Sequence, residues 1–322
     1  MLRGGGVLIF CGLTAFCANA FAPRGASFGK MHRRSLAAAL SAGAVGARVD
    51  GRALPLVYGT AWKKERTQEL VAQAVRAGFR GIDTACQPKH YSEELVGAAI
   101  SEVITSGLVT RDDLWLQTKF TSLSGQDPSN IPYDASQPLE AQVAESIRVS
   151  LRNLQTDRID SLLLHSPMQT FEETLQVWRA FEVAVEAGVV KQLGISNCYS
   201  LQALQRLFDA AVVKPKVLQN RFYEKSGYDV GLRGYCAAKG VTYQTFWTLT
   251  ANPEKLSSPQ ITNAARRLEA TPQQVLFRFL LQSGHQPLTG TKSEEHMKVD
   301  LDIANLDLTA EEMAQIHDLF SG

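Results

Sequence analysis

Residues 81–100, GIDTACQPKHYSEELVGAAI, contain the unit that decides the fold of this chain. The stretch begins as a short buried strand, GIDTA (81–85), and ends as the start of a helix after Ser92. A strand followed by a loop and an amphipathic helix is the repeating unit of a parallel sheet with crossover helices. The strand is apolar and yet carries an acid, Asp83, near its end. We therefore ask which partner balances this carboxylate.

The same unit recurs along the chain. Seven other short apolar runs alternate with helical patterns, at residues 56–61, 114–120, 159–166, 191–197, 217–222, 241–247 and 286–291. The intervening stretches carry apolar residues at three- and four-residue steps, and several end in glycine. Eight such units in about 250 residues are typical of a closed (β/α)8 barrel. An open doubly wound sheet is the alternative, but no G-x-G-x-x-G follows the first strand. We predict an α/β protein with one (β/α)8 TIM barrel domain over residues 51–322.

Residues 1–50 have the composition of a targeting leader. They hold six basic side chains and one acid, Asp50. The apolar run 7–17 is too short to span a bilayer and suits a signal peptide that is cleaved after Ala20. The acid-free segment that follows resembles the second part of a bipartite plastid leader, and Arg33-Arg34 resembles a twin-arginine signal. We predict delivery to a plastid, with the thylakoid lumen as a further destination and simple secretion as the alternative.

The remaining composition excludes several classes of function. The formal net charge is +1, and no basic patch points to nucleic acid. Cys86, Cys198 and Cys236 are too few and too scattered for a disulfide framework. The strand ends lack the cluster of histidines and carboxylates that a metal site requires, which disfavours a barrel hydrolase or isomerase. We expect a monomer that acts on a small molecule, with no nucleic acid partner, no metal and no membrane association in the mature form.

The barrel assignment localises the chemistry. In such barrels, active sites lie at the C-terminal ends of the strands. The polar residues at these ends are Thr60, Asp83, Lys119, His165, Ser196, Asn197, Gln219 and Thr291. An acid, a lysine and a histidine close three consecutive strands, and each would cost several kcal/mol if it were buried without a partner. We therefore expect these three side chains to converge at the barrel mouth.

Short motifs at the strand ends also resemble a known family. In chain order they are Gly59-Thr60, GIDTA (81–85), Thr118-Lys119, LLHSP (163–167), GISN (194–197), Gln219-Asn220 and TKS (291–293). From about Leu54 to Leu319, the chain resembles the aldo-keto reductase superfamily. That family reduces aldehydes and ketones with hydride from a nicotinamide cofactor and uses an Asp-Tyr-Lys-His tetrad. The resemblance implies an NAD(P)H-dependent reductase of small carbonyl compounds.

Three members of the tetrad carry over directly as Asp83, Lys119 and His165. The common family spacing puts the tyrosine at Pro88, which has no proton to donate. Tyr91 lies three residues later, just before the helix start, so we assign the proton donor to Tyr91 in a lengthened loop. His90 as the donor and an inactive site are the competing interpretations. Lys119 would lower the pKa of the tyrosine, Asp83 would keep the lysine charged, and His165 would orient the carbonyl.

The resemblance also implies a cofactor site, with NADPH as the expected cofactor and NADH as the alternative. Ser196, Asn197 and Gln219 match the positions that bind the nicotinamide carboxamide, Phe246 matches the aromatic that stacks on the ring, and Leu249 lies by the pyrophosphate. The full set is Gly59, Thr60, Asp83, Ser196, Asn197, Gln219, Phe246, Leu249, Gly290, Thr291, Lys292, Ser293, His296 and Asp300. Asp300 takes the place of an adenine-binding residue. Gly290 and His296 replace the lysine and arginine that clamp a 2′-phosphate, which weakens the preference for NADPH.

The substrate pocket is expected to be lined by Trp62 and Phe120 beside His165. The chain stops soon after the expected helix at 309–320, so we expect an open pocket. The chain departs from the family pattern at Pro88 and lacks the arginine that clamps the 2′-phosphate. These two differences keep a second function open. In that case, the barrel would bind the cofactor with weak catalysis and act as a redox sensor or an interaction subunit.

Overall fold

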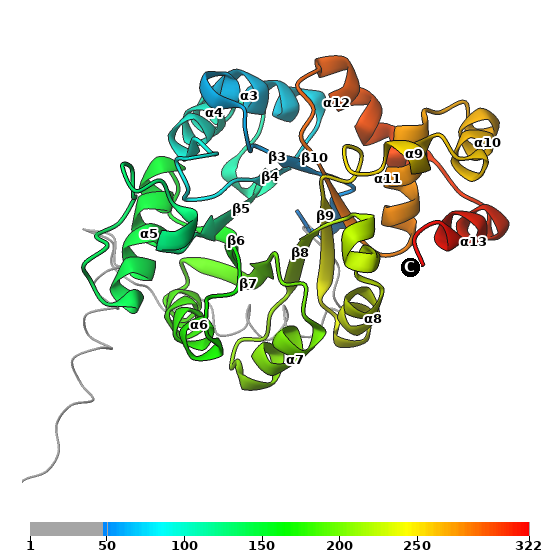
Figure 1. Ribbon diagram of the computed structural model, residues 1–322. Helices are drawn as coiled ribbons and strands as arrows, with labels where there is room; N and C mark the ends of the chain where they lie inside the picture. The colour runs from blue at the N-terminus through cyan, green and yellow to red at the C-terminus, as the bar shows by residue number, and fades with distance from the viewer. Residues whose placement is uncertain (1–47, 50, 322) are drawn as a thin grey trace, which may run out of the picture.

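The computed structural model describes residues 48–49 and 51–321. The predicted leader therefore lies outside the described residues, apart from Arg48 and Val49. Eight parallel strands form a closed barrel in the order β10-β3-β4-β5-β6-β7-β8-β9, and β9 pairs with β10 to close the ring. Helices surround these strands (Figure 1). The predicted (β/α)8 barrel is confirmed.

The eight barrel strands fall where the sequence predicts them. Seven lie within the expected ranges, and β7 begins one residue earlier. Their bounds are β3 Val57–Gly59, β4 Gly81–Asp83, β5 Trp115–Phe120, β6 Ile159–Leu164, β7 Val190–Ser196, β8 Val217–Arg221, β9 Thr242–Phe246 and β10 Gln286–Thr289.

The helices occupy the segments between the strands. They are α3 Thr67–Ala77, α4 Glu93–Thr105, α5 Leu139–Asn153, α6 Phe171–Glu186, α7 Leu201–Ala210, α8 Val230–Lys239, α9 Pro253–Leu256, α10 Pro259–Leu268, α11 Pro272–Gln282, α12 Glu294–Leu301 and α13 Ala310–Asp318. Gly78 ends α3 with a φ of 120°, which favours glycine. Over residues 48–49 and 51–321, no helix is both long and apolar enough to cross a membrane.

Side chains along each strand alternate between the barrel interior and the layer under the helices. On β5, Gln117 and Lys119 point inward and bond to Asp83, so Phe120 points outward. Phe120 is fully buried and packs against Tyr133 and Phe181. The prediction that Phe120 lines the substrate pocket is therefore wrong. Its neighbour Lys119 faces the mouth, and the two-residue period places Phe120 on the opposite face.

A small apolar cluster fills the end of the barrel opposite the mouth. It consists of Leu54, Val57, Trp115 and Leu288, and both Val49 and Phe246 pack against it. Val49 belongs to a short antiparallel hairpin of β1 (Arg48–Val49) and β2 (Arg52–Ala53), which the sequence pattern does not indicate. The hairpin begins at Arg48, three residues before residue 51, where the domain was predicted to start. This packing leaves the C-terminal ends of the strands as the open end for chemistry.

Candidate active site

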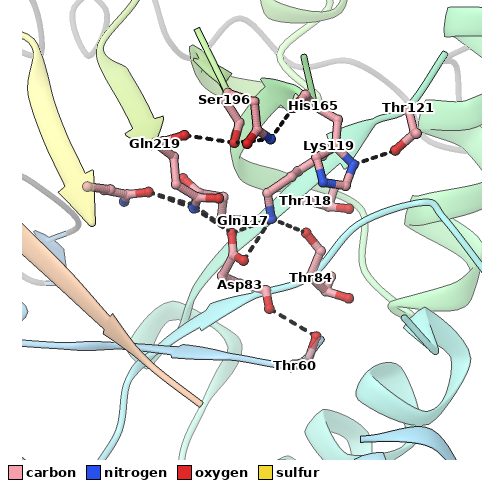
Figure 2. A network of polar contacts seen from close by, with 12 residues as sticks. Thr60, Asp83, Thr84, Gln117, Thr118, Lys119, Thr121, His165, Ser196 and Gln219 are labelled. Carbon is pink, nitrogen blue, oxygen red and sulfur yellow. Dashed lines mark hydrogen bonds and ion pairs between the residues drawn. The ribbon is translucent and has the colours of Figure 1, made fainter. Parts of the chain in front are cut away.

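A buried ion pair lies at the centre of the barrel mouth. Lys119, the fifth residue of β5, donates to both carboxylate oxygens of Asp83 at 2.7 Å and to the Thr84 carbonyl at 2.8 Å. Lys119 is 1% exposed and Asp83 is 3% exposed. Figure 2 shows the ammonium between these acceptors. The lysine is therefore the partner of the acid that ends the strand.

Two glutamines hold the same carboxylate. Gln117 and Gln219 donate to Oδ1 of Asp83 at 2.7 and 3.0 Å. Oδ1 therefore accepts three hydrogen bonds, which fixes its position and compensates for its removal from water. Burial lowers the pKa of the Lys119 ammonium, and the adjacent Asp83 charge opposes that change.

His165 follows the end of β6 and faces the same space. Thr121 lies 2.6 Å from its Nδ1, and Asn197 donates to its backbone carbonyl at 2.8 Å. Burial, followed by the positive charge of Lys119, lowers the pKa of His165 to about 3. The imidazole is therefore neutral at physiological pH.

The long loop after β4 brings Tyr91 into the site. The backbone N–H of Tyr91 donates to the Gln87 carbonyl at 3.1 Å, which closes one turn and leaves Pro88 exposed on the outside. The Tyr91 ring centroid lies 5.3 Å from the Lys119 ammonium and 5.9 Å from the His165 ring. The turn therefore takes up the three additional residues. Asp83, Tyr91, Lys119 and His165 come together, as the sequence predicts for the tetrad.

The proton affinity of Tyr91 differs from the expectation. Burial and the negative charge of Asp83 raise the pKa of its hydroxyl above the ordinary value, whereas the sequence analysis expected Lys119 to lower it. Burial is the larger of these two causes. Lys119 donates its three ammonium protons to Asp83 and Thr84 and none to the Tyr91 hydroxyl. Tyr91 keeps its proton at neutral pH, and its hydroxyl has no hydrogen-bond partner among the described residues.

His90, the competing proton donor, is held by Trp62. The two ring centroids are 3.8 Å apart, and the backbone N–H of Trp62 donates to the backbone carbonyl of His90 at 2.8 Å. Burial lowers the pKa of His90. Trp62 is 59% exposed, and its place on the wall of the substrate pocket stays a prediction.

The residues expected at the nicotinamide lie side by side on β7 and β8. Ser196 donates to the Gln219 carbonyl at 2.8 Å, and the Asn197 amide is 3.3 Å from the Ser196 hydroxyl (Figure 2 shows Ser196 and Gln219). Phe246, at the end of β9, is half-buried above Gln244, and Leu249 is half-buried in the following loop. On the other side of the mouth, the Thr60 hydroxyl donates to the Asp83 carbonyl at 3.0 Å, next to Gly59 at the end of β3.

The residues expected at the adenosine end surround the start of α12. Gly290, Lys292 and His296 are exposed, and Thr291 and Ser293 are half-buried. Ser293 caps the helix by accepting from the His296 N–H. Asp300 is buried, accepts from Thr289 at 2.8 Å, and has a pKa raised to about 6 by burial. Its carboxylate thus supports the end of β10, and its contact with adenine stays a prediction.

Several polar residues of the site were not predicted. Gln117 supports Asp83, Thr121 orients His165, and Lys63 donates to the Gly290 carbonyl at 2.9 Å. Gln117 lies two residues before Lys119, so the two-residue strand period could have placed it inside the barrel. Thr121 and Lys63 lie in loops, where the sequence carries no such period.

Residues 53–320 match the Aldo/keto reductase family. The chain belongs to that family. Among curated relatives, aldo-keto reductase AKR2E4 of Bombyx mori is 27% identical over 83% of this chain and 89% of its own length. An NAD(P)H-dependent D-xylose reductase of Pachysolen tannophilus is 28% identical over 83% and 90%, respectively.

Solved structures of aldo-keto reductases have the same fold. The crystal structure of AKR2E5 of the silkworm, Bombyx mori, superposes with a TM-score of 0.72 and 25% identity, and covers 87% of this chain and 88% of that one. An aldo/keto reductase from Brucella melitensis superposes with a TM-score of 0.70 and 25% identity, over 85% and 98%.

Proposed function

We propose that this aldo/keto reductase family member reduces aldehydes or ketones to alcohols with NADPH or NADH. The observation that carries the proposal is the buried Lys119–Asp83 pair, with the rings of Tyr91 and His165 beside it at the C-terminal end of the barrel. The names of relatives support it, since one is an NAD(P)H-dependent D-xylose reductase and the silkworm AKR2E5 has been crystallised with NADPH.

The side chains at the mouth fit a dinucleotide. Lys63 is buried, and burial together with the charges of Lys292 and Arg66 lowers its pKa to about 8. Lys63, Lys292 and Arg66 repel one another beside Gly290, the residue that follows β10. Phosphate groups bound there would reduce this repulsion. On β7 and β8, Ser196, Asn197 and Gln219 offer polar groups for the carboxamide. When bound, the nicotinamide cofactor supplies the hydride.

The residues of this chain would handle the carbonyl oxygen and the proton. Neutral His165 can donate from Nε2 to the oxygen once the Thr121 hydroxyl donates to Nδ1. Tyr91 then gives its hydroxyl proton to the developing alkoxide. The Lys119 ammonium, 5.3 Å from the Tyr91 ring, is the positive charge beside the resulting phenolate, and Asp83 keeps that ammonium charged. The negative charge that develops on the oxygen thus lies against a positive charge held in a buried site.

The test is consumption of NADPH and NADH with a panel of aromatic and aliphatic aldehydes, using protein from Arg48 onward. We expect Tyr91→Phe to lower kcat by about a hundredfold or more, the range for loss of a general acid. Tyr235→Phe on the outer helix α8 is the matched control and keeps full activity. Lys119→Met also loses activity, but it leaves Asp83 buried without its counter-charge, so its melting temperature must be measured as well.

Two results would redirect the proposal. Full activity in Tyr91→Phe would contradict the assignment of the proton donor and transfer the role to His90. Dinucleotide binding without turnover of any carbonyl would favour the alternative of a redox-sensing or interaction subunit. The specific observation behind that alternative is that Lys119 donates its three protons to Asp83 and Thr84 and none to the Tyr91 hydroxyl.

We also propose that residues 1–50 direct the protein to a plastid. The support is the sequence of an apolar run, a small-residue cleavage site and an arginine-containing, acid-free segment. Residues 1–50 fused to a fluorescent reporter should bring it to the plastid. A reporter that stays in the cytosol would contradict the leader, and a reporter in the medium would indicate secretion.

A further inference from the structure

Arg221 is the last residue of β8 and lies at the barrel mouth. Gln219, two residues earlier, points inward to Asp83, whereas Asn220 points outward and donates to Asp229 at 2.7 Å. The two-residue period therefore places Arg221 on the inner side, one step above Gln219 toward the opening. It pairs in register with Phe246, the residue expected under the nicotinamide.

The Arg221 guanidinium has no acceptor. Its Nε is buried and unbonded, and no carboxylate lies within ion-pair distance in the described chain. The other arginines whose burial is described and that are at least half-buried behave differently. Each donates to a carbonyl or a carboxylate: Arg80, Arg111, Arg158, Arg233 and Arg278. Removing a charged donor from water without giving it an acceptor costs free energy, and a bound ligand that supplies the acceptor would remove this cost.

Aromatic rings hold this guanidinium in place. Its central carbon lies 4.1 Å from the Trp247 ring centroid, 5.4 Å from Tyr223 and 5.8 Å from Phe246. Tyr199 accepts from the Arg221 backbone N–H at 3.2 Å. Trp247 and Tyr199 are both more than one-third exposed, at 53% and 39%. Stacking leaves the planar edge of the guanidinium free, and that edge is the part that binds carboxylate and phosphate oxygens.

We propose that Arg221 is an oxyanion-binding residue of the barrel mouth, and that Trp247, Tyr223 and Tyr199 hold it ready for an anionic group. Two sources offer this chemistry: a phosphate of the dinucleotide and a carboxylate on the carbonyl substrate. The inference rests on the proposed function and deepens it. With a phosphate, Arg221 would bind the pyrophosphate that NADPH and NADH share. With a carboxylate, the substrate would be an aldehyde that carries an acid.

The experiment compares Arg221→Gln and Arg221→Lys with Arg206→Gln. Arg206 is the matched control, because its guanidinium lies 4.0 Å from the Phe171 ring on the outside of the barrel. Dissociation constants for NADPH and NADH are measured from protein fluorescence. The KM values of 4-oxobutanoate and butanal, which differ by the carboxylate, are measured at saturating cofactor. Melting temperatures show that each variant is folded.

We expect Arg221→Gln to weaken the binding of one anionic group by about tenfold or more, which is the effect of losing a charged hydrogen bond. Weaker binding of both dinucleotides identifies the phosphate. A raised KM for 4-oxobutanoate with that of butanal unchanged identifies the carboxylate. Arg221→Lys should lose less of this anion affinity, and Arg206→Gln should lose none. No change in either measurement, or an equal change for the two aldehydes with unchanged dinucleotide binding, would overturn the proposal.

The anion site can be tested even if the protein is not a reductase. If wild-type protein reduces neither aldehyde, the dinucleotide dissociation constants still test the phosphate. The carboxylate is then tested by calorimetric titration of the dinucleotide-loaded protein with succinate. Loss of either binding in Arg221→Gln alone would support the anion site in a protein that is not a reductase.

Discussion

At the scale of single residues, Tyr91 and His90 can be distinguished by the pH dependence of the rate. Tyr91 has a raised pKa and keeps its proton, and His165, with a pKa of about 3, stays neutral. If Tyr91 is the donor, kcat/KM should be flat from about pH 5 to about pH 9. If His90 is the donor, its lowered pKa means that the protonated form disappears as the pH rises, and kcat/KM should fall before neutrality.

The measurement is kcat/KM of the wild type across this range, with His90→Ala beside it. We expect His90→Ala to keep the flat profile and to change KM more than kcat, because it removes the ring stacked on Trp62. A decline between about pH 5 and 7 that disappears in His90→Ala would contradict the role of Tyr91.

The residues of this site were only partly predictable from the sequence. Asp83, Lys119 and His165 could be found because each is an ionisable group at the end of an apolar strand. The position of Tyr91 depended on how a loop of five residues turns, and the structure resolves this with one hydrogen bond to Gln87. The raised pKa of Tyr91 could not be foreseen, since it follows from how deeply the folded loop buries the hydroxyl and from its nearness to the Asp83 charge.

At the scale of elements, Asp160 joins three strands at the end opposite the mouth. It lies on β6, accepts from the Leu116 N–H of β5 at 3.0 Å, and pairs with Arg111 at 2.8 Å and with Lys191 of β7 at 2.7 Å. We expect Asp160→Asn to lower the free energy of unfolding by about 3 kcal/mol, because a buried charge pair loses one partner. Urea unfolding measures this, with kcat unchanged because the site is far away. The exposed Asp157→Asn is the control.

The pH dependence of this contribution has a defined sign. Burial alone would raise the pKa of Asp160, but Arg111, Lys191 and the Leu116 N–H outweigh it, and the pKa lies below its ordinary value. The stabilisation is therefore present above the unfolded pKa of about 4 and is lost as the pH falls through the lower folded value. The difference between wild type and Asp160→Asn should shrink in acid. A constant difference down to about pH 2 would contradict the ion pair as its source.

Elements were more predictable than the contacts between them. The barrel strands could be recognised because each combines an apolar run with a following helix pattern. The β1–β2 hairpin has two residues per strand, too few to show a period. The prediction for Phe120 was wrong because Phe120 follows Lys119 in the sequence and was therefore placed beside it at the mouth. Adjacent residues of a strand face opposite sides of the sheet.

At the scale of the whole molecule, a chain of amides runs from the mouth to the closed end. Gln117 and Gln219 donate to Oε1 of Gln244 at 2.8 and 3.0 Å, Gln244 donates to Gln286 at 2.9 Å, and Gln286 donates to the Leu54 carbonyl at 3.1 Å. These residues come from four strands, and their meeting depends on the stagger of the barrel. Their pairing therefore could not be read from sequence spacing.

From this row of hydrogen-bonded amides we predict that Gln244, which lies below the active site, supports the position of Asp83. Gln244→Met removes the acceptor of both glutamines that hold Asp83, so two buried N–H groups lose a partner. We expect the free energy of unfolding to fall by about 3 kcal/mol and kcat to fall about tenfold as Asp83 loses its fixed position. Urea unfolding and aldehyde turnover measure the two effects. Gln192→Met on β7 is the control, because Gln192 makes one long bond of 3.4 Å to Ser161. If both variants lose equally little stability, the amide chain does not support Asp83, and the ion pair with Lys119 alone fixes the carboxylate.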